Sequence, residues 1–230
     1  MMMKTRRAAL MMMGYGLLEG CVSRPEGTMV SKASSPTLDP SFQATYAALH
    51  DEPFPVDAVD LKRVDPKFLR REITYMTKEQ PGTVVVDPAA RHAYLVIEGG
   101  RAIRYGVGVG KQEAFNFRGE ATIARKAQWP RWTPTQDMIH REPERYTKYA
   151  GGLPGGAGNP LGPRALYLFR GGEDTLYRLH GTVEPWTIGK MVSSGCIRFL
   201  NQDIIDLYRR VPVGSKVVVL AASPDIVQAA

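Results

Sequence analysis

The chain has 230 residues, of which 43% are hydrophobic and 23% are charged, an ordinary balance for a globular protein with one substantial domain. The formal net charge is +7 at pH 7, but the sequence shows no dense run of lysine and arginine and no nucleic-acid-binding motif. Nucleic acid is therefore excluded as an expected partner. Such a diffuse basic excess is typical of a solvated surface, and it also suits an anionic cell-wall polymer or a membrane surface.

The N-terminus has the pattern of an export signal. Three basic residues precede an apolar run over residues 8–18, which is too short to span a bilayer as an ordinary transmembrane helix. The run ends in Leu18-Glu19-Gly20-Cys21, which resembles a bacterial lipobox apart from the glutamate. We predict a signal peptide over residues 1–20 and export to the periplasm or cell envelope, with Cys21 as the lipidated first mature residue and membrane anchor. The alternative is a plain, cleaved signal peptide.

The sequence contains two cysteines, Cys21 and Cys196. If Cys21 is lipidated or removed with the signal, Cys196 has no partner within the chain. An unpaired thiol in an oxidising compartment is a liability unless its reactivity is used. We therefore interpret Cys196 as a candidate nucleophile, and the alternative is a buried, inert cysteine.

Residues 21–45 are rich in Ser, Pro, Thr and Gly, which predicts a tether. The apolar residues of the following segment, 46–80, are scattered. We expect this segment to pack against the main domain and to contain a short helix over residues 66–71.

The main domain is predicted over residues 81–222, followed by a tail over residues 223–230. An amphipathic helix is expected to begin with Asn201 as N-cap and to end at Pro212, because apolar residues recur between them at helical spacing. Many short strands and few helices predict a mostly β fold, a sandwich or barrel with one or two short helices. The strands are expected at residues 83–86, 93–97, 102–109, 122–126, 164–169, 175–179 and 215–220.

Two glycine- or proline-rich tracts do not carry nucleotide-binding motifs. Residues 106–110 alternate glycine with valine but lack the spacing and the following helix of a dinucleotide fingerprint, and residues 151–163 lack the Gly-Lys-Ser/Thr of a phosphate loop. Between them, Trp129 and Trp132 flank prolines in a rigid loop. These rings could stack on a sugar or wall a cleft, or they could pack the loop onto the domain.

His180 is the best candidate for a base to serve Cys196. Acyl transfer by a thiol needs a nucleophile, a base that returns the proton to the leaving amine, and N–H donors for the oxyanion. His180 is expected at a strand end, sixteen residues before Cys196, whereas the other three histidines lie in unremarkable surroundings. Gly195 permits a tight turn whose amides could receive the oxyanion. A zinc site is poorly supported, since no histidines and cysteines stand at ligand spacing.

The ordered motifs of the C-terminal half resemble the catalytic domain of L,D-transpeptidases. His180-Gly181-Thr182 and Ser193-Ser194-Gly195-Cys196-Ile197-Arg198 carry most of this resemblance, which extends over roughly residues 81–220. Ser194 departs from the family, which often has histidine there. The supporting motifs are Val107-Gly108-Val109-Gly110, Gly158-Asn159-Pro160-Leu161-Gly162, Pro185, Ile188-Gly189, Asn201, Asp203 and Leu207-Tyr208.

The resemblance implies a peptidoglycan cysteine transpeptidase of the cell envelope that needs no cofactor or metal. Cys196 would attack the tetrapeptide stem before its terminal D-Ala, form a thioester and pass the acyl group to an amine acceptor, giving a 3-3 cross-link. His180 would be the general acid/base, oriented by the carbonyl of Gly181. The remaining expectations are support or oxyanion binding by Ser193, Ser194 and Gly195, and substrate contacts by Arg198 and Trp186; an ion pair is the alternative role for Arg198.

Three other functions stay open at this point. Water could accept the acyl group, giving an L,D-carboxypeptidase, or an envelope protein could accept it and become anchored to peptidoglycan. Both use the same acyl-enzyme, so the sequence does not separate them. A different class of function is an inactive peptidoglycan-binding lipoprotein, which the presence of both His180 and Cys196 disfavours.

Overall fold

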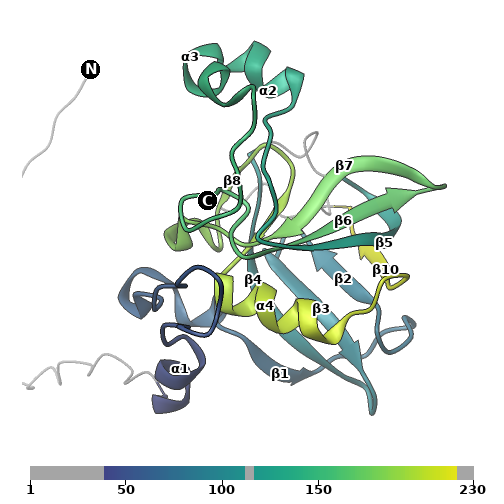
Figure 1. Ribbon diagram of the computed structural model, residues 1–230. Helices are drawn as coiled ribbons and strands as arrows, with labels where there is room; N and C mark the ends of the chain where they lie inside the picture. Colours follow the sequence, from purple (N-terminus) through teal and green to yellow (C-terminus); the bar gives the residue numbers. More distant parts are fainter. Residues whose placement is uncertain (1–38, 112–116, 222–230) are drawn as a thin grey trace, which may run out of the picture. The chain divides into compact units, whose positions relative to one another are not determined.

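The computed structural model describes residues 39–111 and 117–221 (Figure 1). These residues belong to one compact unit, Leu38–Ala230. The predicted signal peptide, Cys21 and the tail over residues 223–230 lie outside the described residues, as does the predicted tether up to residue 38. Within the described part, no helix is long and apolar enough to cross a membrane.

The fold is built on one sheet of ten strands that curves into a barrel. Its hydrogen-bonded order is β1-β4-β3-β2-β10-β5-β6-β7-β9, and a further pairing between β4 and β9 closes the circuit while β8 pairs with β4. The strands are β1 (Arg71–Thr74), β2 (Val84–Asp87), β3 (His92–Ile97), β4 (Arg101–Gly110), β5 (Gly119–Gln128), β6 (Arg164–Arg170), β7 (Glu173–His180), β8 (Met191–Ser193), β9 (Ile197–Phe199) and β10 (Lys216–Val219).

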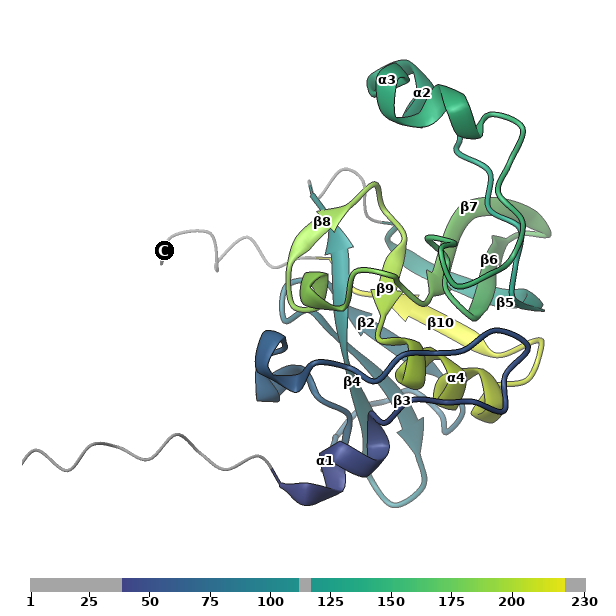
Figure 2. The same cartoon turned by 60° about the vertical axis from the view of Figure 1, so that its left-hand side comes forward.

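The predicted fold class is confirmed, with more helices than expected. The described residues contain four short α-helices rather than one or two: α1 (Pro40–Thr45), α2 (Gln136–Arg141), α3 (Pro143–Tyr146) and α4 (Asn201–Arg210). Figures 1 and 2 show α4 lying against the sheet, whereas α2 and α3 stand away from it. Ile204 and Leu207 of α4 are fully buried in the same apolar core as the strand residues, because its apolar side chains repeat at helical spacing.

The segment before β2 has a small apolar cluster of its own. Tyr46, Val64, Phe68 and Leu69 pack with Ile188 and Leu200, which come from the C-terminal part of the chain. The prediction of a helix over residues 66–71 was wrong. Only Pro66–Phe68 forms a 3-10 turn, capped by Asp65, because the chain then pairs in antiparallel register with β4 as strand β1.

The start of α4 differs from the prediction by one residue. Leu200 occupies the N-cap position and makes no side-chain cap, while Asn201 is the first helical residue. The Asn201 side chain is used elsewhere, since its Oδ1 accepts a hydrogen bond of 2.9 Å from the backbone N–H of Thr182. The prediction failed because a residue type that favours caps also binds backbone groups far along the chain.

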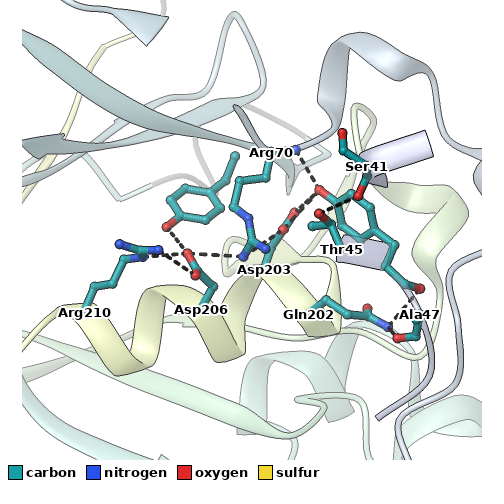
Figure 3. A network of polar contacts seen from close by, with 10 residues as sticks. Ser41, Thr45, Ala47, Arg70, Gln202, Asp203, Asp206 and Arg210 are labelled. Carbon is teal, nitrogen blue, oxygen red and sulfur yellow. Dashed lines mark hydrogen bonds and ion pairs between the residues drawn. The ribbon is translucent and has the colours of Figure 1, made fainter. Parts of the chain in front are cut away.

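A buried polar network fixes α4 to the N-terminal segment (Figure 3). The hydroxyl of Tyr46 lies 3.1 Å from both carboxylate oxygens of Asp203 and accepts a bond of 2.6 Å from the N–H of Arg70. The Arg70 guanidinium lies 3.6 Å from Asp203 and 3.2 Å from Asp206. Fully buried charge requires such partners, so this segment and helix are held in one relative position.

Candidate active site

Strand pairing brings His180 and Cys196 to one place. Strands β7 and β9 are parallel neighbours, with His180 opposite Arg198. His180 is the last residue of β7, and Cys196 directly precedes β9. Both side chains line a cavity of about 740 Å³. The fifteen residues between them, 181–195, form the connection, and several of these residues line the cavity.

The turn before Cys196 is shaped by Ser193 and Gly195. Gly195 has φ +130°, a conformation that residues with a Cβ rarely adopt. The buried Ser193 hydroxyl donates to the carbonyl of Cys196 at 2.7 Å and accepts from the N–H of Gly195 at 3.1 Å. The Gly195 amide is therefore engaged in supporting the turn and is not a free oxyanion donor.

The His180 ring is held as a neutral base. It is 5% exposed, and its Nδ1 lies 2.6 Å from the carbonyl oxygen of Gly181, which can only accept. Nδ1 therefore carries the proton, and Nε2 is left as the basic atom. Burial, followed by the positive charge of Arg198, lowers the pKa of His180 to about 3.

The thiol of Cys196 is also neutral at rest. Burial raises its pKa, and a hydrogen bond from the backbone of Arg178 with the charges of Arg178 and Arg198 opposes that rise. Its Sγ lies 3.9 Å from the carbonyl oxygen of Leu176. A neutral thiol and a neutral imidazole that line the same cavity can act as nucleophile and base once a substrate receives the negative charge.

The cavity has an aromatic and basic wall on the side of α2 and α3. Trp132 lines it and makes edge contacts with the rings of Tyr146 and Tyr149. Basic residues from the same region, Arg141, Arg145 and Lys148, also line the cavity. Trp132 thus walls the cleft, whereas Trp129 packs against Phe54 and donates its ring N–H to Glu52.

Residues 81–219 match the family described as the L,D-transpeptidase catalytic domain. The match covers more than half of the chain and includes both strands that carry the site. The chain belongs to this family. The strands, the turn and the cavity described above are accordingly those of an L,D-transpeptidase catalytic domain.

Two relatives from Escherichia coli strain K12 illustrate the similarity. "Probable L,D-transpeptidase ErfK/SrfK" is 39% identical over 43% of this chain and 30% of its own length. "Probable L,D-transpeptidase YbiS" is 34% identical over 58% of this chain and 43% of its own length. The chain thus spans less than half of the length of either relative.

Solved structures also resemble the chain. One from Brucella melitensis, titled "probable carnitine operon oxidoreductase caia", is 50% identical, with a TM-score of 0.47 over 70% of this chain and 99% of that one. An L,D-transpeptidase from Mycobacterium smegmatis is 21% identical, with a TM-score of 0.44 over 60% of this chain and 58% of that one.

The structure gathers most of the predicted site residues but not Trp186. Ser193, Ser194 and Arg198 line the cavity with His180 and Cys196. Trp186 lines a separate cavity of about 340 Å³, and the guanidinium of Arg63 covers its ring at 4.3 Å. Trp186 therefore lies outside the cavity that holds Cys196, because the short helical turn over residues 185–187 directs the ring to the N-terminal segment, and its predicted contact with substrate stays a prediction.

Arg198 makes the ion pair that was the alternative to substrate binding. Its Nη1 lies 2.7 Å from Glu184 Oε2, and both side chains are part-buried at the cavity. Sequence reasoning overlooked Leu176 and Arg178, whose backbone groups contact the Cys196 sulfur. The available signal was Thr-Leu-Tyr-Arg before the histidine, but a strand prediction does not show which carbonyl faces a distant cysteine. Among the described residues, no three His, Cys, Asp or Glu side chains are grouped as a metal site requires.

Proposed function

We propose that the chain is a peptidoglycan L,D-transpeptidase that works through a thioester on Cys196. The observation that carries the proposal is the pairing of β7 with β9 in a domain of this family. This pairing places a neutral His180 and the Cys196 thiol on the wall of one cavity. The substrate class follows from the family, and the assignment of roles follows from the geometry of the two side chains.

In the first step, His180 Nε2 takes the thiol proton as Sγ attacks the carbonyl carbon before the terminal D-Ala of a tetrapeptide stem. The C–N bond breaks, and the imidazolium returns its proton to the departing D-Ala amine, leaving a thioester. In the second step, an acceptor amine attacks the thioester and gives a proton to His180. The C–S bond then breaks and the thiolate is reprotonated. We assign the oxyanion donor to the amide of Cys196, since that of Gly195 is engaged by Ser193.

The basic side chains that line the cavity suit an anionic peptide as the acyl donor. Arg141, Arg145 and Lys148 line the cavity beside two tyrosines and Trp132. Stem peptides carry free carboxylates, which guanidinium and ammonium groups bind by charge-assisted hydrogen bonds. Arg198 is paired with Glu184 and Arg145 with Glu142, so pairing does not separate the two sides of the cavity; we assign the substrate carboxylate to the α2–α3 side because three basic side chains line the cavity there.

The products of a single incubation test the proposal. The protein with a disaccharide-tetrapeptide should release D-Ala and form a cross-linked dimer detectable by mass spectrometry. Cys196→Ala and His180→Ala should each abolish both products in protein that near-UV circular dichroism shows to be folded. Tripeptide without dimer would show that water is the acceptor, and D-Ala release by Cys196→Ala would overturn the mechanism.

We further propose that the protein acts outside the cytoplasm as a lipoprotein. The support is the basic and apolar pattern of residues 1–20 and the lipobox-like Cys21, which lie outside the described residues. Metabolic labelling with a fatty-acid probe should mark the wild type and not Cys21→Ser. A Cys21→Ser variant that is exported and still fractionates with membranes would contradict the lipid anchor.

A further inference from the structure

Strand β7 carries a bulge directly beside the candidate nucleophile. On β6, Phe169 pairs with Asp174 and Tyr167 pairs with Arg178. One residue lies between the two β6 positions and three lie between their partners, so β7 has two extra residues here. Leu176, in the middle of this bulge, has φ +63°, which is rare for a residue with a branched side chain. Its side chain lines the cavity and is 62% exposed. Strained backbone that persists next to a reactive group indicates a function for its shape.

Local hydrogen bonds hold the bulge in this shape. Asp174 Oδ1 accepts from the N–H of Leu176 at 2.8 Å. The hydroxyl of Thr175 donates to the carbonyl of Leu168 at 2.6 Å and accepts from the N–H of Tyr177 at 3.2 Å. The backbone groups that leave the strand ladder are thus satisfied by side chains, which keeps the extra residues from rearranging.

The same Asp174 fixes the guanidinium of Arg178. The two carboxylate oxygens accept bonds of 2.7 and 2.8 Å from the two terminal nitrogens of Arg178, a two-pronged pair. Arg178 also donates to the carbonyl of Tyr177 at 2.9 Å, and its guanidinium lies 4.4 Å from the centre of the Tyr167 ring. The Arg178 side chain is 14% exposed, so this positive charge is held in one place with little solvent around it.

Two backbone groups of the bulge meet the sulfur of Cys196. The carbonyl oxygen of Leu176 lies 3.9 Å from Sγ, and the backbone of Arg178 makes a hydrogen bond to the same sulfur. A carbonyl accepts from a thiol, whereas an N–H group favours a thiolate. The bulge therefore offers a partner to each protonation state of the nucleophile.

We infer that the β7 bulge positions the nucleophile, and this inference rests on the role proposed for Cys196. Arg178 is a positioning residue, and its charge, held in place by Asp174, favours the thiolate. Arg178 does not line the cavity, so it acts on the sulfur through the protein rather than by touching the substrate.

The charges around Cys196 fix the sign of the expected effect. Arg178 and Arg198 lower the pKa of Cys196 and Asp174 raises it, while Arg178 also lowers the pKa of His180. Removing the Arg178 charge should therefore raise both pKa values, making the thiolate scarcer at neutral pH. The other titratable and charged residues near the sulfur or lining the same cavity are Asp137, Arg141, Arg145, Tyr146, Lys148, Tyr149, Tyr177, His180 and Glu184.

The experiment measures the rate of Cys196 alkylation by iodoacetamide against pH, by intact mass, in Arg178→Gln, Arg178→Lys and the wild type. Arg178→Gln should move the midpoint up by about one pH unit, the lower end of the effect of a nearby opposite charge. Arg178→Lys keeps the charge and should bring the midpoint back toward that of the wild type. Arg125→Gln is the matched control, because Arg125 stacks on the same Tyr167 ring at 3.5 Å from the other neighbouring strand.

A midpoint in Arg178→Gln that coincides with the wild type would overturn the inference, as would an equal shift in Arg125→Gln. Near-UV circular dichroism shows that each variant is folded before its curve is used. In the transfer assay, Arg178→Gln should lower kcat severalfold and leave KM unchanged. Alkylation needs no peptidoglycan, so a shifted curve in a protein that forms no cross-link would keep the inference and refute the proposed function.

Discussion

The position of the His180 ring depends on the residue that follows it. A Cβ atom at Gly181 would collide with Asn201 Oδ1 and would lie 2.9 Å from the ring of Pro163. Asn201 Oδ1 in turn binds the N–H of Thr182. Because the Gly181 carbonyl orients Nδ1 of His180, any shift of this segment moves the base.

Gly181→Ala should therefore impair catalysis more than folding. The overpacked contact should cost about 1–3 kcal/mol of unfolding free energy, and the displaced carbonyl should lower kcat at least tenfold. Gly151→Ala is the control, since a Cβ there meets nothing within 4 Å. Transfer assays and urea unfolding of both variants test this, and a fully active Gly181→Ala would contradict the role of Gly181.

The buried neutral His180 predicts a loss of stability in acid. Its pKa is lowered to about 3 in the folded chain and lies near 6.5 in the unfolded chain, so unfolding takes up a proton below pH 6.5. The contribution of the neutral His180 to the unfolding free energy is fully present above pH 6.5 and declines as the pH falls toward 3. Between pH 7 and pH 5, the wild type should lose about 2 kcal/mol more unfolding free energy than His180→Asn. Equal losses in urea titrations would show that the imidazole is charged or exposed.

At the scale of elements, the attachment of α4 to the N-terminal segment joins residues that are far apart in the sequence. Tyr46 and Asp203 are 157 residues apart and meet in a fully buried contact. Burial raises the pKa of Asp203 to about 7, opposed by Arg70 and the Tyr46 hydroxyl. The network therefore depends on each donor that reaches this carboxyl group.

Tyr46→Phe should destabilise the protein by about 2 kcal/mol, because it leaves a buried carboxyl group and the N–H of Arg70 short of a partner. Tyr75→Phe is the control, since the half-buried Tyr75 ring stacks on Tyr94 at 4.5 Å and should cost less than about 0.5 kcal/mol. Thermal or urea unfolding measures both. A cost for Tyr46→Phe no larger than that for Tyr75→Phe would show that the network does not secure the segment.

The elements that the sequence predicted well are those with strong local patterns. Val84, Val85 and Val86 are buried within β2, and the periodic apolar residues of α4 face the core. Strands β8 and β9, with three residues each, were not predicted. They form because β8 pairs with β4, and β9 pairs with both β4 and β7. These partner strands lie far away in the sequence, so the local pattern of three residues does not predict the pairing.

For the molecule as a whole, the motifs located the candidate nucleophile and base, but not how they are held. His180 and Cys196 carry distinctive neighbours in sequence, so both could be singled out as candidates, and the structure places both on the wall of one cavity. The bulge at Leu176, the Arg198–Glu184 pair and the direction of Trp186 depend on strand register and on the N-terminal segment, which no local pattern encodes. The same long-range packing that shapes the cavity therefore limits what can be predicted from its residues.

The most direct test of the central claim is the intact mass of the protein after mixing with a tetrapeptide donor in the absence of an acceptor amine. We predict an added mass equal to the donor minus D-Ala, located on Cys196 by peptide mapping, absent in Cys196→Ala, and lost when an amine acceptor is added as cross-linked product forms. Release of D-Ala with no adduct on Cys196, or an adduct that persists in Cys196→Ala, would contradict the account.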